Sequence, residues 1–292
     1  MLVNSSAAQA FIPDRTWLGT LDLQFERRGD VTRLSKSRHI GPLYVQKPFY
    51  PEGPDHPHVY LLHPPGGIVS GDALEISVES KAGAGVLVTT PGAARIYRAR
   101  RDLPLQRQST FLTIAKDAIV EWFPLETIVF NDAYVALNTT VDLTDTSRFI
   151  GWEICCFGLP ASNQPFVMGN FKQHYTVRKN GVPLFVDRLV LNAQSYTILN
   201  GVAGLRSKTV SGFFLLGPIE DSSAPVLESL REIAGQMNAQ TVAAVSKVGE
   251  FYIGRYLGTS AEQAKQIFTQ WWTVLRPLFI HRKASIPRIW TT

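Results

Sequence analysis

The sequence is poor in cysteine and has no long apolar run. Its only cysteines are Cys155 and Cys156, and adjacent residues on a strand point to opposite faces, so the pair is badly placed for a disulfide or for a shared metal ion. A disulfide-built secreted fold is therefore excluded, and a reducing compartment fits. No stretch of about 18 apolar residues is present, and Met1 to Ala10 lack the basic start and apolar run of a signal peptide. We expect a soluble, cytoplasmic protein with no membrane association.

Charge of one sign is not in large excess either. Lys plus Arg number 29 and Asp plus Glu number 24, which gives a formal net charge of +5. This surplus permits an acidic partner but does not by itself indicate nucleic acid. Hydrophobic residues make up 45% of the 292 residues and charged residues 18%, so the chain can bury a large core. The length fits one large β-rich unit, and we expect a single domain over residues 1–292.

Short β-strands dominate the pattern of the chain. From Thr16 to Phe25, polar and apolar residues alternate with a period of two. Similar runs recur up to residue 216, and Gly or Pro stands in nearly every gap. Asn180-Gly181, between two such runs, predicts a β-hairpin. After the first, the expected strands are 44–49, 59–62, 74–78, 86–90, 110–114, 118–123, 127–130, 134–141, 149–156, 171–177, 184–191 and 210–216.

A first helix is expected after this β-rich region. Ser222 or Ser223 can cap it, Pro225 lies in its first turn, and apolar residues follow at helical spacing as far as Met237. The fold class is thus predicted to be mainly β, a β-rich single domain with two C-terminal α-helices.

The second helix begins at a capping box formed by Ser260 and Gln263. Its apolar stripe contains Trp271 and is widened by Trp272. Pro277 is expected to end or kink it, because proline cannot donate the helical hydrogen bond.

Glycines are dense between His63 and Asp72, as in loops that bind phosphate. However, no Lys-Ser or Lys-Thr pair follows, and the segment leads into an expected strand, so the cradle of helix N–H groups is missing. A tight turn where two backbones approach closely explains the glycines better. We expect no nucleotide binding by this chain.

Arginines cluster between residues 95 and 107, with a tyrosine among them. Three interpretations stay open: nucleic-acid binding, a solvated charged loop, and a docking face for an acidic protein. The modest net charge and the lack of a nucleic-acid motif count against the first. The expected partner-binding residues of this cluster are Arg95, Tyr97, Arg98, Arg100 and Arg101.

Carboxylates occur at Glu121 on an expected strand and at Glu126 just after it, followed by Asp132 and later by Glu153. They suit the acid and base of an all-β hydrolase, or transient oxygen ligands on a path for a divalent ion, or plain surface positions. On a strand, Glu121 and Phe123 share one face and Trp122 takes the other, which indicates a partly apolar setting for Glu121.

The chain has 6 histidines, and imidazole is a good nickel ligand. Only His56 and His58 have a suggestive spacing, and Pro57 between them weakens a regular strand. A pair alone is not a tight site, so two ordinary loop histidines are the alternative. No catalytic-triad elbow, zinc motif or dinucleotide fingerprint is present.

A set of short motifs runs through the chain in order. They are 41–53, 61–69 with Gly71-Asp72, 89–98, 121–124, 275–277, and 287–290 with Thr292. Together they resemble the UreD (also called UreH) family of urease accessory proteins over nearly the whole chain, whereas residues 198–258 resemble it only loosely. The resemblance implies a mainly β fold with helix-like winding of the strands and a couple of α-helices.

The same resemblance implies a function without catalysis. Family members are scaffolds that bind apo-urease and recruit UreF and, through UreF, the GTPase UreG for nickel insertion into urease. No cofactor is expected to bind tightly, nickel passes only transiently, and GTP hydrolysis belongs to UreG. A homodimer within the accessory complex is left open.

A polar nickel channel is part of this resemblance, and the chain departs from the family pattern near it. An arginine and a carboxylate are missing at Leu159 and Gln164, so nickel transfer is expected to be weaker if that carboxylate lines the channel. The apolar face of the Trp-rich second helix is expected to need a partner protein that covers it. Trp271 and Trp272 are therefore further candidates for partner binding, and we expect poor solubility of the chain without a UreF-type partner. Our candidates for the transient nickel path are Asp72, Glu121, Glu126, Glu153, His56 and His58.

Overall fold

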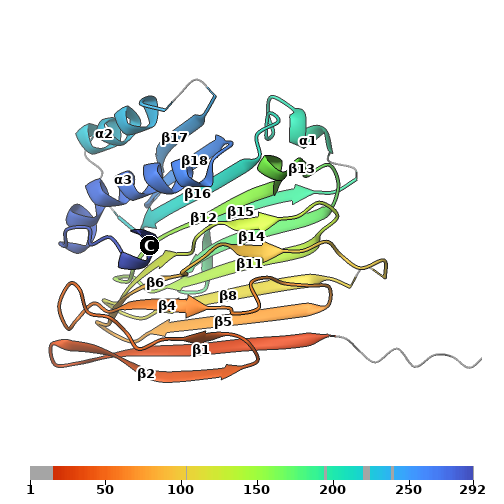
Figure 1. Cartoon of the computed structure of the whole chain (residues 1–292). Coiled ribbons are helices and arrows are strands. Elements are labelled where there is room, and N and C mark those ends of the chain that lie inside the picture. The colour runs from red at the N-terminus through yellow and green to blue at the C-terminus, as the bar shows by residue number, and fades with distance from the viewer. Residues whose placement is uncertain (1–15, 103, 194–195, 220–223, 238–239, 292) are drawn as a thin grey trace, which may run out of the picture.

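Two facing β-sheets make up most of the molecule. The computed structural model describes residues 16–102, 104–193, 196–219, 224–237 and 240–291. Within these residues strands far outnumber helices, and Figure 1 shows α2 and α3 together on one side of the sheets. The mainly β fold predicted from the sequence is confirmed. No helix in the described part of the chain is long and apolar enough to cross a membrane.

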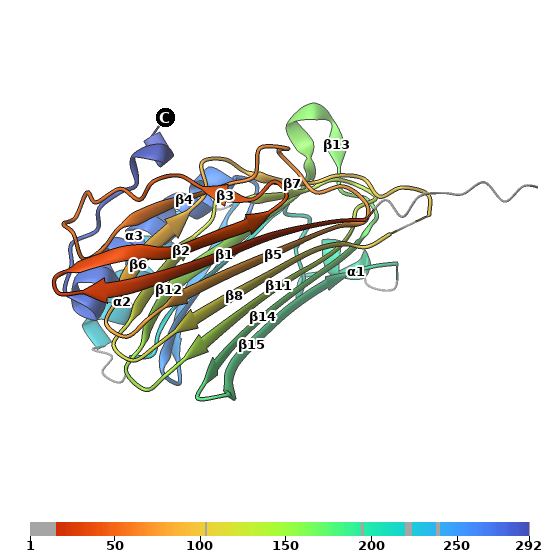
Figure 2. The same ribbon diagram turned by 90° about the horizontal axis from the view of Figure 1, so that it is seen from below.

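The first sheet has seven strands among the described residues, and Figure 2 shows most of them side by side. Its outer hairpin β14–β15 turns at Asn180 and Gly181, which both have positive φ, as the sequence predicted for a tight Asn-Gly turn. The order is β15 (Val182–Leu191), β14 (Asn170–Lys179), β11 (Tyr134–Leu143), β8 (Gln106–Ile114), β5 (Asp72–Ser80), β1 (Trp17–Arg28) and β2 (Val31–Ile40).

The second sheet lies opposite the first and is longer. Its main path is β17 (Val242–Val248), β18 (Phe251–Gly258), β16 (Val210–Gly217), β12 (Arg148–Leu159), β9 (Ile119–Phe123), β6 (Gly85–Thr89), β4 (His58–Leu62) and β3 (Tyr44–Val45). Beside this path lie β10 (Thr127–Val129), β7 (Ala94–Ile96) and β13 (Gln164–Pro165).

The chain winds between the sheets. β5, β8, β11 and β14 are parallel neighbours in the first sheet, and β6, β9 and β12, which lie between them in sequence, are parallel neighbours in the second. Each coil of this winding therefore contributes one strand to each layer. This arrangement is the helix-like winding that the family resemblance implied.

An apolar core fills the space between the layers. Alternate residues of each strand point inward, so Leu23, Phe25 and Val141 of the first sheet share one buried cluster with Val88 and Val120 of the second. A second cluster lies on the far face of the second sheet, under the helices. The second sheet is thus apolar on both faces, and its central strands β6 and β9 have almost no exposed residue.

The long helix α3 (Ala261–Ile280) covers β12, β16 and β18. The Ser260 half of the predicted capping box is confirmed, because Ser260 Oγ accepts a hydrogen bond from the Gln263 N–H at 3.2 Å. The Gln263 side-chain oxygen instead accepts from Thr241 and Tyr256, both at 3.3 Å. Pro277, however, does not end the helix, which continues to Ile280 and stops at His281 in the left-handed conformation. Because proline has no N–H, the helix passes Pro277 without the hydrogen bond that this residue would donate to the Thr273 carbonyl.

The remaining elements include several that the sequence did not indicate. α2 (Ala224–Gly235) packs on β17 and α3 as expected, while its predicted caps Ser222 and Ser223 lie outside the described residues. α1 (Tyr196–Asn200), η1 (Pro160–Ser162) and η2 (Arg288–Thr291) are short, and the strands β2, β17 and β18 were not predicted. β2 is an edge strand rich in polar residues, so alternation gave no signal there.

Candidate functional site

A buried polar network lies between α3 and the second sheet. On β9, Val120 and Trp122 point into the core between the sheets, whereas Glu121 and Phe123 point toward α3. Glu121 and Arg276 of α3 are both completely buried. Burial of charged groups is costly unless they are paired, so every atom of this network needs a partner.

Both oxygens of the Glu121 carboxylate are hydrogen-bonded. Oε1 accepts from Trp272 Nε1 at 2.7 Å and from Arg276 Nε at 3.0 Å. Oε2 accepts from Arg276 Nη2 at 2.8 Å and lies 2.8 Å from His56 Nε2. The sequence-based expectation of a partly apolar setting for Glu121 is confirmed, and its interpretation as a surface carboxylate is wrong.

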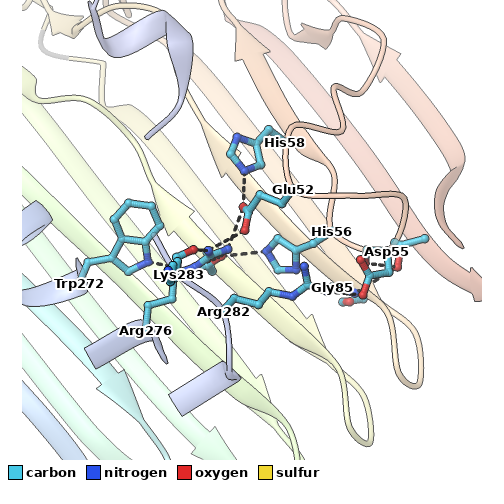
Figure 3. A network of polar contacts seen from close by, with 12 residues as sticks. Glu52, Asp55, His56, His58, Gly85, Trp272, Arg276, Arg282 and Lys283 are labelled. Atoms are coloured by element: carbon cyan, nitrogen blue, oxygen red, sulfur yellow. Dashed lines mark hydrogen bonds and ion pairs between the residues drawn. The ribbon is translucent and has the colours of Figure 1, made fainter. Parts of the chain in front are cut away.

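A second carboxylate, Glu52, completes the network from the loop before β4. Its Oε2 accepts from Arg276 Nη1 at 2.6 Å, and its Oε1 accepts from Arg276 Nη2 at 2.8 Å and lies 2.6 Å from His58 Nε2. Figure 3 shows His58, Glu52 and Arg276 pointing toward one another, with His56 and Trp272 on either side. Arg276 also donates to the Lys283 carbonyl, so its guanidinium joins three distant segments of the chain.

The network holds both carboxylates in the ionised form. Burial alone raises the pKa of Glu121, but the His56 hydrogen bond and the Arg276 charge outweigh it and lower that pKa to about 2. For Glu52 burial also acts upward, yet hydrogen bonds from His58 and Arg276 leave its pKa below the ordinary value. A carboxylate that stays ionised and fully hydrogen-bonded is poorly suited to be a general acid.

Three side chains of the network lie close enough together to be considered as metal ligands. One ligand atom each from Glu52, His56 and Glu121 lie within 4.8 Å of one another, and oxygen and imidazole donors suit nickel. However, the Arg276 guanidinium bonds both carboxylates and occupies the place that a cation would take. The set therefore fits a guanidinium, and it joins loop, sheet and helix as a structural ion network.

The other predicted nickel-path residues lie elsewhere. The Asp72 carboxylate accepts from the Val69 N–H at 2.9 Å and closes the glycine-rich turn. Glu126 is half-buried in the loop between β9 and β10, close to Cys156. Glu153 on β12 faces the space between the sheets, where Thr139 and Gln173 donate to it at 2.5 and 2.6 Å. The structure thus brings His56, His58 and Glu121 together but keeps the remaining carboxylates apart.

Glu153 lies in a cavity of about 230 Å³ between the two sheets. Burial raises the pKa of Glu153, although the Thr139 and Gln173 hydrogen bonds act against it. Burial likewise lowers the pKa of His63 in the same cavity, against the pull of Asp72. The polar side chains of the lining are His63, Thr90, Gln108, Thr127, Asn138, Thr139, Glu153 and the thiol of Cys155, and the rest is apolar or small.

The predicted arginine cluster follows β7 along one end of the molecule. Arg95, Arg98 and Arg101 are exposed; Arg98 lies 3.6 Å from Asp132. Arg100 forms a bidentate pair with Asp102, at 3.1 and 3.0 Å. Tyr97 is half-buried and packs against Phe130 at a centroid distance of 5.2 Å. Its residues are positioned on a surface, and their role in partner binding stays a prediction.

The prediction for the two tryptophans of α3 is wrong. Partner binding was predicted for Trp271 and Trp272, but both are fully buried within the chain. Trp271 Nε1 donates to the Leu230 carbonyl of α2 at 2.9 Å, and Trp272 is bound to Glu121. The second sheet and α2 already cover this helix, so neither side chain is available to a partner.

The departures from the family pattern lie on a small surface hairpin. Leu159 and Gln164 pair with each other where β12 meets β13, and Gln164 is exposed. Neither residue lines the cavity that holds Glu153. Glu52 and Arg276 were not predicted as residues of a site. The available signal was Arg276 itself, a charged residue on the apolar face of the helix, four residues after Trp272.

Comparisons with known proteins show which family the chain is related to. The family model of the UreD urease accessory protein matches residues 18–291. A urease accessory protein UreD of Marinomonas sp. is 44% identical over 94% of this chain and 90% of its own length. Relatives of the same name from Psychromonas ingrahamii and Chromohalobacter salexigens are 40% and 38% identical, over 96% and 99% of this chain and 96% and 93% of their own lengths.

These matches define the class of protein as a urease accessory protein. Within that class, the chain belongs to the UreD family.

Proposed function

We propose that the chain is a non-enzymatic cytoplasmic scaffold, which binds apo-urease and recruits UreF and, through UreF, the GTPase UreG for nickel insertion. The observation that carries this proposal is family membership over nearly the whole chain. The ion network supports a scaffold over the alternative hydrolase, because its carboxylates are held ionised and saturated with hydrogen bonds. Nickel is the cargo of this assembly and is not a resident cofactor.

We further propose that the cavity between the sheets is the part of the chain that nickel passes. Glu153 is the one carboxylate among the residues that line it, with Asn138 and Gln108 as neutral oxygen donors. In this proposal Glu121, His56 and His58 support the fold around the path and do not bind the ion. The arginine cluster remains the candidate face for an acidic partner.

The test is co-expression of apo-urease, UreF and UreG with and without this chain, followed by pull-down and urease activity after addition of nickel. We expect complex formation and activation to require the chain; independence of both would overturn the proposal. Glu153→Gln should lower activation while the complex still forms. The matched control is Glu75→Gln on the outer face of β5, which should change neither.

A further inference from the structure

The two sheets end at different places, and this leaves one sheet face open. β15 is the last strand of the first sheet, whereas β17 and β18 extend the second sheet beyond it. On β17, the residues that face the same side as Arg255 of β18 are Val242, Ala244, Ser246 and Val248, and all four are exposed. Val242 is 42% exposed and Val248 is 56% exposed. The helix α2 packs on the opposite face of β17, where Ala243 and Val245 belong to the apolar cluster under the helices.

A groove of about 980 Å³ occupies the step between the sheets; we call it the edge groove. One wall is formed by the end of β15 from Arg188 to Val190, and another by α1 with the turn that follows it, residues 197–205. The floor consists of residues from β16, β18 and β17, including Val242 and Ala244. Val202 on the second wall is 79% exposed, an unusual value for a valine beside other apolar residues.

A link between the two sheets holds one wall of the edge groove to its floor. Arg255 of β18 donates to both oxygens of Asp187 on β15, at 2.9 and 2.5 Å. The same guanidinium lies 4.9 Å from the ring centroid of Phe213, which stacks on Phe185 of β15 at 5.5 Å. Because these contacts hold the β15 wall to the floor of the groove, this part of the groove is formed before any partner arrives, which lowers the entropic cost of binding.

The charge that is left without a counter-ion at the edge groove is positive. Its charged lining residues are Arg188 and Arg255, and no carboxylate belongs to the lining. The Asp187 carboxylate is already bound by Arg255, while Arg188 is exposed. Arg206 and Lys208 follow directly after the turn that forms the second wall. An apolar surface with arginines at its rim is complementary to a segment with apolar and acidic side chains.

We propose that the edge groove binds an acidic amphipathic helix of one of the proteins with which this chain assembles. Two turns of helix about 10 Å across occupy on the order of 850 Å³, which fits the groove. A second copy of this chain is less well matched, since its net charge is +5. The inference rests on the proposed scaffold function, because it supplies the binding site for one partner of that assembly.

The test uses two valines on the same face of the same strand. Val242 lines the edge groove and Val248 does not, although both are exposed. In the co-expressed complex of the chain with apo-urease, UreF and UreG, we expect Val242→Glu and Arg188→Glu to weaken binding of one partner by about tenfold or more, because each places a carboxylate against an acidic segment. Val248→Glu should change that affinity by less than about twofold, and thermal unfolding should show that all three variants are folded.

A photo-crosslinking residue at position 242, with position 248 as control, identifies the occupant in the same complex. Crosslinks from position 242 to an acidic, apolar segment of a partner support the proposal. Crosslinks from position 242 only to a second copy of the chain, or no crosslink in a complex that still forms, overturn it and leave the scaffold function standing. If no complex forms even with the unaltered chain, the scaffold function fails and this inference fails with it.

Discussion

At the scale of single residues, Arg276 decides how the buried charges behave. Its guanidinium donates four short hydrogen bonds to the carboxylates of Glu121 and Glu52. Because Arg276 is completely buried, water cannot replace these hydrogen bonds. A buried ion pair adds little net stability compared with apolar residues of the same size. Removal of one partner is a different matter, since it leaves a buried charge without compensation.

We therefore expect Arg276→Met to destabilise the fold by about 3–5 kcal/mol, because Glu121 and Glu52 lose their shared counter-charge. Chemical denaturation of the two proteins measures the difference. The matched control is Arg231→Met on α2, which breaks an exposed pair with Glu228 and should cost less than about 1 kcal/mol. Equal effects of the two substitutions would contradict the importance of the network.

The lowered pKa of Glu121 predicts a pH dependence of stability. A carboxyl group whose folded pKa lies near 2, below the ordinary 4.5, stabilises the folded state above about pH 4.5, and this contribution is lost as the pH falls toward 2. The difference in unfolding free energy between the unaltered chain and Glu121→Gln should therefore be constant from about pH 7 to 5 and shrink below about pH 4.5. Urea titrations along this range measure it, with Glu75→Gln as control; a difference that does not change with pH would refute the assignment.

At the scale of elements, turns and caps set where the strands and helices stop. The glycine-rich segment after β4 is a tight turn, since an added Cβ at Gly67 would lie 2.4 Å from Tyr97 Cε2 and 2.8 Å from the Arg95 carbonyl oxygen. The Ile68 N–H donates to the same Arg95 carbonyl at 2.7 Å. The turn therefore fixes β7 and the start of the arginine cluster against the body of the protein.

Gly67→Ala should destabilise the protein by about 1–3 kcal/mol, because the added methyl group pushes both the Arg95 backbone and the Tyr97 ring away from the turn. Thermal unfolding reports the loss. Gly92→Ala, in a loop where an added Cβ would meet nothing within 4 Å, is the control and should leave the unfolding temperature within about 2 °C. A silent Gly67→Ala substitution would show that the backbones have room to separate.

At the scale of the whole molecule, the unequal sheets leave apolar side chains exposed at one edge. The aromatic residues of α3 are covered, so they are not the reason for the expected poor solubility of the isolated chain. The exposed candidates are instead Val182, Leu184 and Val186 on the edge strand β15, together with the edge groove. Edge strands with apolar faces promote association between chains.

We expect Leu184→Lys to raise the soluble fraction of the chain expressed alone by about twofold or more, because a charge on an edge strand opposes pairing with other chains. The measurement compares soluble and total protein after lysis. Leu23→Lys, in the core between the sheets, is the opposite control and should abolish soluble protein. Co-expression with a UreF-type partner should raise solubility without any substitution; equal solubility with and without that partner would count against the expected dependence.

Local sequence signals predicted the strands in the middle of the two sheets well and the strands near their ends poorly. Alternation, Asn180-Gly181 and the Ser260 cap were each confirmed, because their physical cause lies within a few residues of the chain. β2 and β17 are edge strands, whereas β18 lies between β17 and β16; none of the three was predicted, because none has a clean alternation of polar and apolar residues. The burial of Trp271 and Trp272 within the chain was also not predicted, since periodicity shows that a helix has an apolar face but not what covers that face.

Local pattern in the chain was enough to predict the β-rich class, the two C-terminal helices and the lack of a phosphate-loop motif, and the order of short motifs was enough to show the likeness to the UreD family. Each of these depends on local pattern or on motifs in fixed order. Only the tertiary structure decided that Glu52 and Arg276, 224 residues apart, form one ion network with Glu121, and that the sheets end out of step to leave a basic, apolar groove. Such contacts depend on how distant segments pack, and packing is a property of the folded chain that no short stretch of sequence contains.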